Sequence, residues 1–282
     1  MKNGLVLEGG GMRSLFSEGV FDVLLENGIK FDGTIGVSAG ATIGSNFKSR
    51  QARRALRYNI NHSNDWRYVS LRSWITTGDI VGGEYSYHVL PFQHDIFDIA
   101  AYEANPMEFY AVCTDVDSGE YFVKQLPKIN YEALEWMRAS ASMPIVSRPV
   151  SIGGRRYLDG GIANSIPLEY FQSIGYERNL VILTQPIGYR KKKTKLMPLF
   201  NIFCRKTPKI KEAMRRRHLM YNAQLDYISL QQQLGNTLVV CPDEALPIGR
   251  LEMKPDKMRH IYNLGRELGL KNLERIKVFL DK

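Results

Sequence analysis

Hydrophobic residues occur along this chain in short continuous runs that alternate with helical patterns. The run GLVLE at residues 4–8 is typical of a buried strand, and the apolar positions between residues 15 and 25 recur at helical spacing. The same order then repeats, because residues 31–36 predict a strand and residues 39–58 predict a helix. Two strand–turn–helix units in series predict an α/β protein in which parallel strands are flanked by helices.

Further strands and helices are expected along the rest of the chain. Strands are expected in residues 107–114, 121–124, 148–152, 156–158, 179–184 and 237–241. Helices are expected in residues 131–141, 208–234 and 255–280. Turn residues within the first two pairs of strands predict two antiparallel hairpins. Residues 61–106 are rich in aromatic side chains and show no regular pattern, so we expect a lid or a substrate-facing insertion there.

Ser38 lies in the sequence GVSAG, directly after the second expected strand. The small residues Gly36 and Gly40 permit a sharp turn that presents a serine hydroxyl at the head of a helix. Such a hydroxyl becomes an effective nucleophile when a base accepts its proton and when fixed donors stabilise the charge that develops on the attacked carbonyl oxygen. We therefore interpret Ser38 as a nucleophile that requires these two partners.

A glycine-rich turn after the first strand can supply the fixed donors. Gly9, Gly10 and Gly11 permit backbone conformations that aim successive N–H groups at one point, and the helix that follows adds its positive end. Arg13 could add a positive charge close by. This turn is the predicted oxyanion hole.

Asp159 can supply the base, since it follows an expected hairpin and precedes Gly160 and Gly161. An ordinary aspartate has a pKa of about 3.9 and is a weak base for a hydroxyl proton. Partial burial would raise that pKa, and direct contact with Ser38 would remove the need for a histidine between them. A structure that held the two side chains far apart would contradict this hypothesis.

Together these motifs resemble the patatin-like phospholipase family over residues 4–184. The resemblance rests on GLVLEGGGMRS, on GVSAG, on RASASMPIVSRPV at residues 138–150 and on YLDGG at residues 157–161. One position differs from the family pattern, because the glycine that usually follows the arginine is Ser14 here. The region beyond Thr184, including IGRLE at residues 248–252, resembles the C-terminal extension of a bacterial subgroup.

The resemblance implies both a fold and a set of roles. It implies a three-layer α/β/α fold with a mostly parallel central sheet, and a Ser–Asp dyad made of Ser38 and Asp159. It also implies that the N–H groups of Gly10 and Gly11 form the oxyanion hole, with Arg13 in support. The expected activity is hydrolysis of lipid carboxyl esters, as in a phospholipase, lysophospholipase or esterase, through an acyl-enzyme on the serine.

The expected domain organisation has two parts. Residues 1–185 form the catalytic core, and residues 186–282 form a basic and helical extension packed on the same domain. No metal ion or organic cofactor is expected, because Asp115, Asp117 and Glu120 are too closely spaced for a calcium-binding loop.

Positive charge is concentrated in one segment. The chain has 38 basic and 29 acidic residues, a net charge of +9, and the segment from Arg190 to Arg217 holds twelve of the basic residues and one acid, Glu212. Such a segment attracts anionic lipid headgroups at about 1 kcal/mol per cation, although a solvated helix face would have the same composition. Nucleic acid is not expected as a partner, because no aromatic residues that could stack on bases interrupt its basic runs.

Cysteine usage and the N-terminus indicate a cytoplasmic location. Cys113, Cys204 and Cys241 are odd in number and far apart, which argues against a disulfide framework and against a zinc site. The apolar run near the N-terminus is too short for a signal peptide or a membrane span. We therefore expect a cytoplasmic protein that contacts the inner face of the membrane peripherally.

Three other functions are consistent with parts of the sequence. The glycine turn followed by Asp32 imitates a dinucleotide-binding fingerprint, which would indicate an oxidoreductase. A Ser–His–Asp hydrolase would need His218 or His260, and we expect both of these to be solvated surface residues. A non-enzymatic lipid-binding module is the third alternative, and it predicts that Ser38 can be replaced without loss of function.

Overall fold

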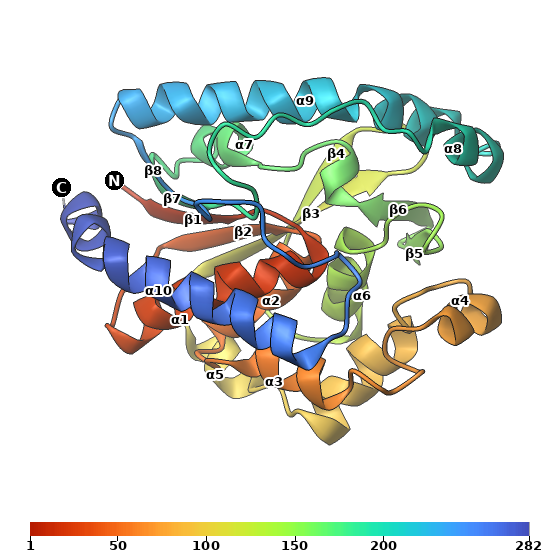
Figure 1. The fold of residues 1–282 in the computed structure, drawn as a ribbon, viewed down its shortest axis with the longest axis horizontal. Helices are drawn as coiled ribbons and strands as arrows, with labels where there is room; N and C mark the ends of the chain where they lie inside the picture. Colours follow the sequence, from red (N-terminus) through yellow and green to blue (C-terminus); the bar gives the residue numbers. More distant parts are fainter. Residues whose placement is uncertain (282) are drawn as a thin grey trace.

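The computed structural model describes residues 1–281 and places a central sheet between two layers of helices (Figure 1). The strand order is β5-β6-β3-β2-β1-β7-β8, and β4 pairs with β3 outside that path. The strands are β1 (Asn3–Leu7), β2 (Gly33–Val37), β3 (Glu108–Asp115), β4 (Tyr121–Gln125), β5 (Val150–Ile152), β6 (Arg155–Asp159), β7 (Arg178–Ile182) and β8 (Thr237–Val240). Strands β3, β2, β1, β7 and β8 run parallel to one another, and β4, β5 and β6 are paired antiparallel.

Helices cover both faces of this sheet. The α-helices are α1 (Leu15–Glu26), α2 (Ala39–Lys48), α3 (Arg54–Asn61), α4 (Leu71–Thr77), α5 (Ile99–Ala104), α6 (Tyr131–Ser140), α7 (Leu168–Ser173), α8 (Met197–Phe203), α9 (Pro208–Gln233) and α10 (Pro255–Leu280). Helix α9 lies over one face with α7 and α8, whereas α1, α2 and α10 lie on the opposite face (Figure 1). The three-layer α/β/α fold predicted from the sequence is thereby confirmed.

The strands β1 and β2 are buried on both faces, which explains why they read as continuous apolar runs. The predicted hairpin between β5 and β6 is also confirmed. Its turn has φ values of +58° at Gly153 and +78° at Gly154, a pair of left-handed conformations that glycine adopts without strain and that suits a tight two-residue hairpin.

The single helix expected over residues 39–58 is wrong, because the structure contains two helices, α2 and α3, in that region. Arg50 and Arg53 between them have φ values of +57° and +61°, which no helix can continue through. The second helix begins where carboxylates from α1 accept its first N–H groups: Asp22 accepts from Arg53 at 2.7 Å, and Glu18 accepts from Ala55 at 2.6 Å. These acceptors are some thirty residues away in sequence, so local pattern could not reveal the break.

Residues 61–106, for which no regular elements were expected, contain α4, α5 and a π-helix, Tyr85–His94 (η2). Pro91 lies within the π-helix and cannot donate a backbone hydrogen bond, which weakens any sequence-based expectation of a helix there. Tyr68, Val81 and Tyr87 from this region line the main cavity of the protein. Part of this region therefore faces the cavity, and its role as a lid or a substrate-facing insertion stays a prediction.

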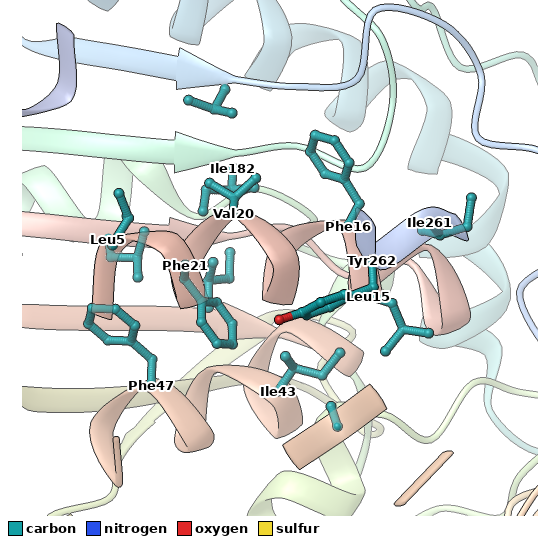
Figure 2. Close-up of a cluster of buried hydrophobic side chains, with 14 of the residues drawn as sticks. Leu5, Leu15, Phe16, Val20, Phe21, Ile43, Phe47, Ile182, Ile261 and Tyr262 are labelled. Atoms are coloured by element: carbon teal, nitrogen blue, oxygen red, sulfur yellow. The ribbon is translucent and has the colours of Figure 1, made fainter. Parts of the chain in front are cut away.

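Two C-terminal elements, the helix α10 and the strand β8, share the N-terminal core. Helix α10 packs along α1, and Leu15, Phe16, Val20, Ile261 and Tyr262 meet in one apolar cluster (Figure 2). The helices approach closely at glycines: a side chain at residue 265 would lie 2.0 Å from the carbonyl oxygen of Phe16. Strand β8 extends the same sheet through β7. The boundary at residues 185 and 186 stays a prediction.

Candidate active site

Strand β3 aligns the two residues proposed from the sequence as a dyad. The last pair between β2 and β3 joins Val37 to Val112, and the first pair between β6 and β3 joins Asp159 to Cys113. Ser38 follows directly after Val37. Val112 and Cys113 are adjacent on β3. The C-terminal ends of β2 and β6, which pair with them, therefore lie at the same level on either side of β3.

Ser38 occupies a strained backbone conformation between β2 and α2. Its φ of 57° and ψ of −130° cost on the order of 1–3 kcal/mol for a residue with a side chain, and the surroundings must hold it there. The Ser140 hydroxyl accepts a hydrogen bond from the N–H of Ser38 at 2.9 Å and donates one to the carbonyl of Val112 at 2.6 Å. Space is also tight, because a side chain at Gly36 or Gly40 would lie 2.6 Å from backbone atoms.

The hydroxyl of Ser38 donates a hydrogen bond to the carboxylate of Asp159, with 2.6 Å between Oγ and Oδ2. The other carboxylate oxygen accepts from the N–H of Gly161 at 2.7 Å, which fixes the orientation of the group. Only 2% of Asp159 is exposed. Burial raises the pKa of Asp159 above its ordinary value, while the hydrogen bond from Ser38 and the charge of Arg217 act in the opposite direction. No histidine stands between the two side chains.

The glycine turn lies against Ser38. A side chain at Gly9 would come within 2.6 Å of the Cβ of Ser38, so only glycine permits this approach. Within residues 1–281, the N–H groups of Gly10 and Gly11 have no hydrogen-bond acceptor. Arg13 donates from Nε to the carbonyl oxygen of Gly10 at 3.4 Å. Gly10 and Gly11 line the same cavity as Ser38, and their N–H groups are free to donate to a ligand there. Their role as an oxyanion hole stays a prediction.

The chain between β8 and α10 supports the same turn from the far end of the sequence. The carbonyl oxygen of Arg250 accepts a hydrogen bond from the N–H of Met12 at 3.0 Å. Gly11, at φ +58°, leaves no room for a side chain, because a Cβ there would lie 2.2 Å from that same oxygen. The motif IGRLE, which has no role in the sequence-based predictions, therefore packs against the glycine turn.

Ser38 and Asp159 open into a cavity of about 500 Å³, a size typical of sites for small molecules. Much of its wall is apolar and comes from several elements. The apolar lining includes Leu15, Ile43, Tyr58, Val69, Ile80, Val81, Met143, Ile145, Leu196, Phe200 and Met214. Such a wall suits a hydrocarbon chain better than a polar ligand.

Several residues of this site were missed by sequence reasoning. Ser140 lies within the motif RASASMPIVSRPV but was given no role, and its contacts with Ser38 arise only on folding. His218 was expected at the solvated surface, and this expectation is wrong: it lines the cavity, and its Nδ1 is buried without a hydrogen-bond partner among the described residues. Helix α9 carries His218 toward the site because the face that holds it packs over the sheet.

The geometry argues against a dinucleotide fingerprint. Asp32 precedes β2 and accepts a hydrogen bond from the N–H of Asn3, at the start of β1, at 2.6 Å. Gly10 lies beyond the C-terminal end of β1. The glycine turn and Asp32 are therefore at opposite ends of the strands. In a dinucleotide-binding unit the acidic residue reaches the ribose at the carboxyl end of the strands. The oxidoreductase alternative is therefore wrong.

Comparison with protein families agrees with these motifs. A family model described as patatin-like phospholipase matches residues 5–171, more than half of the chain. The chain belongs to the patatin-like phospholipase family. A second model, for a domain of unknown function, matches residues 207–281 of this patatin-like protein. Membership in a bacterial subgroup stays a prediction.

Curated relatives of this patatin-like protein include enzymes and an uncharacterised protein. It is 25% identical over 97% of its length to lysophospholipase nte1 of Aspergillus oryzae, and it spans 18% of that protein. It is 29% identical to the uncharacterised YjjU of Escherichia coli, with 64% of this chain and 52% of YjjU covered. The crystal structure of VipD from Legionella pneumophila aligns with a TM-score of 0.50 at 12% identity, covering 97% of this chain and 67% of VipD, which indicates a shared fold.

Replacing Ser140 tests how the strained serine is held. In Ser140→Ala the N–H of Ser38 and the carbonyl of Val112 both lose a buried partner, so the free energy of unfolding should fall by about 1–3 kcal/mol. Urea titration followed by circular dichroism measures this change. Ser173→Ala, which removes an exposed hydroxyl that bonds only within its own helix, is the control and should change stability by less than about 0.5 kcal/mol. Equal stability of the two variants would contradict the assignment.

Proposed function

We propose that this protein is a serine acyl hydrolase that cleaves carboxyl esters of lipids through the dyad of Ser38 and Asp159. The observation that carries the proposal is the 2.6 Å hydrogen bond between the two side chains, made inside a largely apolar cavity. The N–H groups of Gly10 and Gly11, which have no partner among residues 1–281 and line the same cavity, support this proposal.

In the proposed reaction Ser38 Oγ attacks the ester carbonyl carbon while Asp159 accepts the hydroxyl proton. The carbonyl oxygen becomes negatively charged and is stabilised by the N–H groups of Gly10 and Gly11. The bond between the carbonyl carbon and the alcohol oxygen then breaks, and Asp159 returns the proton to the leaving alcohol. Water attacks the acyl-enzyme in the same way, with Asp159 again as the base, and releases the fatty acid.

A lipid ester is the substrate class that the cavity and the relatives favour. The apolar wall can accommodate an acyl chain, and transfer of each methylene out of water contributes about 0.8 kcal/mol. The fungal relative named above is a lysophospholipase, although this chain spans only 18% of it. A phospholipid or lysophospholipid is accordingly the proposed substrate.

We further propose that the segment from Arg190 to Arg217 contacts an anionic membrane. Helix α8 within it exposes Ile202 and Phe203, by 69% and 53%, next to the cations Arg205 and Lys206. Exposed apolar side chains beside cations favour an anionic lipid surface. Among residues 1–281, none of the helices combines the length and the hydropathy that crossing a bilayer requires.

Loss of either dyad residue should abolish ester hydrolysis. Ser38→Ala removes the nucleophile and Asp159→Asn removes the base, so kcat/KM should fall at least about a hundredfold in each. Release of p-nitrophenol from esters of increasing chain length, without added metal ions, measures this loss and shows whether longer chains are preferred. If the wild type and both variants are equally inert yet bind liposomes, the alternative of a non-enzymatic lipid-binding module is favoured.

The fall of kcat/KM on the acid side of the pH profile should reflect protonation of Asp159. The base acts when deprotonated, so kcat/KM for a neutral p-nitrophenyl ester should fall as pH drops through the raised pKa of Asp159, above the ordinary value of about 3.9. Arg217→Gln removes a charge that lowers this pKa and should move the midpoint to higher pH. Arg216→Gln, an exposed neighbour, should leave the midpoint unchanged. An acid limb that does not move in Arg217→Gln would contradict the electrostatic account.

Membrane contact through α8 should depend on its exposed apolar residues. Ile202→Asp places a negative charge where an acyl region is expected, and sedimentation with vesicles that contain phosphatidylglycerol should weaken about tenfold or more. Leu270→Asp on α10, an exposed leucine on the opposite side of the sheet, is the matched control and should sediment like the wild type. Identical sedimentation of the two variants would exclude α8 as the contact.

A further inference from the structure

Five basic side chains line the same cavity as Ser38. They are Arg13, Lys191, Lys192, Arg217 and Arg250. Only Arg13 belongs to the glycine motif, whereas the other four lie beyond the residues that the patatin-like family model matches. The C-terminal part of the chain thus brings its own positive charge to the proposed active site.

Contacts of the side chain or of the backbone place three of the four C-terminal cations, Lys191, Arg217 and Arg250, at the cavity. Arg217 donates from Nε to the carbonyl oxygen of Gly161, next to Asp159. The ammonium group of Lys191 lies 4.0 Å from the centre of the Tyr221 ring. Arg250 is anchored through its backbone to the glycine turn. The cluster therefore adjoins both the proposed base and the proposed oxyanion hole.

The charges of Glu8 and Asp159 act on this cluster, but neither carboxylate forms an ion pair with it. No ion pair of residues 1–281 involves any of the five side chains. The nearby carboxylate of Glu8 is already engaged, since it accepts from the backbone N–H of Thr184 at 2.6 Å and from the hydroxyl of Tyr221 at 2.6 Å.

The titration of Lys191 reflects this crowding. Burial lowers the pKa of Lys191 to about 7, and the neighbouring charges of Arg217 and Arg250 act in the same direction. Cations gathered in a partly enclosed space repel one another, and an anion bound among them would relieve that repulsion. The cluster combines guanidinium groups, which form paired hydrogen bonds to phosphate oxygens, with an ammonium group that acts as a compact charge.

We propose that Lys191, Arg217 and Arg250 form the subsite that binds the phosphate of the substrate, so that residues beyond the patatin-like family model set the preference for a phosphate-bearing ester over a neutral one. This inference rests on the proposed hydrolase function and names the residues that determine its specificity. The acyl chain would occupy the apolar part of the cavity while the phosphate lies among the cations. Hydrolysis would then release a fatty acid and a phosphate-bearing alcohol.

A pair of short esters that stay monomeric separates this subsite from membrane attraction. The substrates are 1-hexanoylglycerol 3-phosphate and the neutral 1-hexanoylglycerol, which share one acyl group and one scissile bond. For the wild type, kcat/KM should be at least about tenfold higher for the phosphate ester, and Lys191→Gln and Arg250→Gln should each reduce that ratio about tenfold. Arg217 is left intact because it also holds Gly161. Lys193→Gln, an exposed lysine of the same run that does not line the cavity, is the control and should keep the wild-type ratio.

A binding measurement on Ser38→Ala separates failure of the subsite from failure of the hydrolase. Glycerol 3-phosphate should bind this variant, as measured by calorimetry, and should bind Ser38→Ala/Lys191→Gln at least about tenfold more weakly.

The outcomes distinguish the subsite from the hydrolase. If the wild type cleaves both esters with equal kcat/KM and neither variant changes the ratio between the two esters, the subsite is overturned while the hydrolase stands. If neither ester is cleaved, the hydrolase fails and the binding result alone decides the subsite. Inorganic phosphate that inhibits both esters equally would assign the cluster to free phosphate and overturn the substrate class.

Discussion

The pairing of β3 with both β2 and β6 is the constraint on which the proposed active site depends. Neighbouring positions of β3, Val112 and Cys113, are paired with the last residue of β2 and with Asp159. Side chains alternate between the two faces of a sheet, so a slip of one residue in either ladder would turn Asp159 away from Ser38. Ser140 adds a second link, because its hydroxyl joins β3 to the backbone of Ser38.

The site concentrates several features that are unfavourable for stability. Ser38 has a left-handed φ, Asp159 is a buried carboxylate, and cations gather around the cavity. The hydrogen bond from Ser38, the N–H of Gly161 and the charge of Arg217 stabilise the ionised carboxylate of Asp159. The hydroxyl of Ser140 holds the backbone of Ser38. A strained backbone or a buried charge is maintained only where contacts with the surrounding structure hold it in place. The large cluster of α1 and α10 beneath the sheet supplies part of that support (Figure 2).

The C-terminal region contributes to the site as well as to the core. The family model for patatin-like phospholipases ends at residue 171, and a separate model of unknown function covers residues 207–281. Helix α9 and the chain before α10 nevertheless carry Arg217 and Arg250 to the cavity. A substrate-binding role would explain why a region without a described function accompanies the catalytic motifs.

Much of the architecture was predictable from local sequence. The five parallel strands are apolar runs, and the three antiparallel strands were expected from β-prone runs that flank turn residues. The glycine turn and the serine turn could be expected because sharp turns need small residues. Ser38 and Asp159 could be singled out by motif. The α2–α3 break could not be predicted, since it depends on Glu18 and Asp22 of another helix.

Only the tertiary structure decided which distant side chains share the cavity. The basic segment was visible as a run of charge, yet its sequence does not distinguish Lys193, which is exposed, from Lys191, which lies over Tyr221 inside the cavity. Ser140, His218 and Arg250 likewise reach the site through packing over long sequence separations. Local pattern reports the conformation of a segment, whereas the direction of a side chain toward a neighbour far along the chain is fixed by strand register and helix packing.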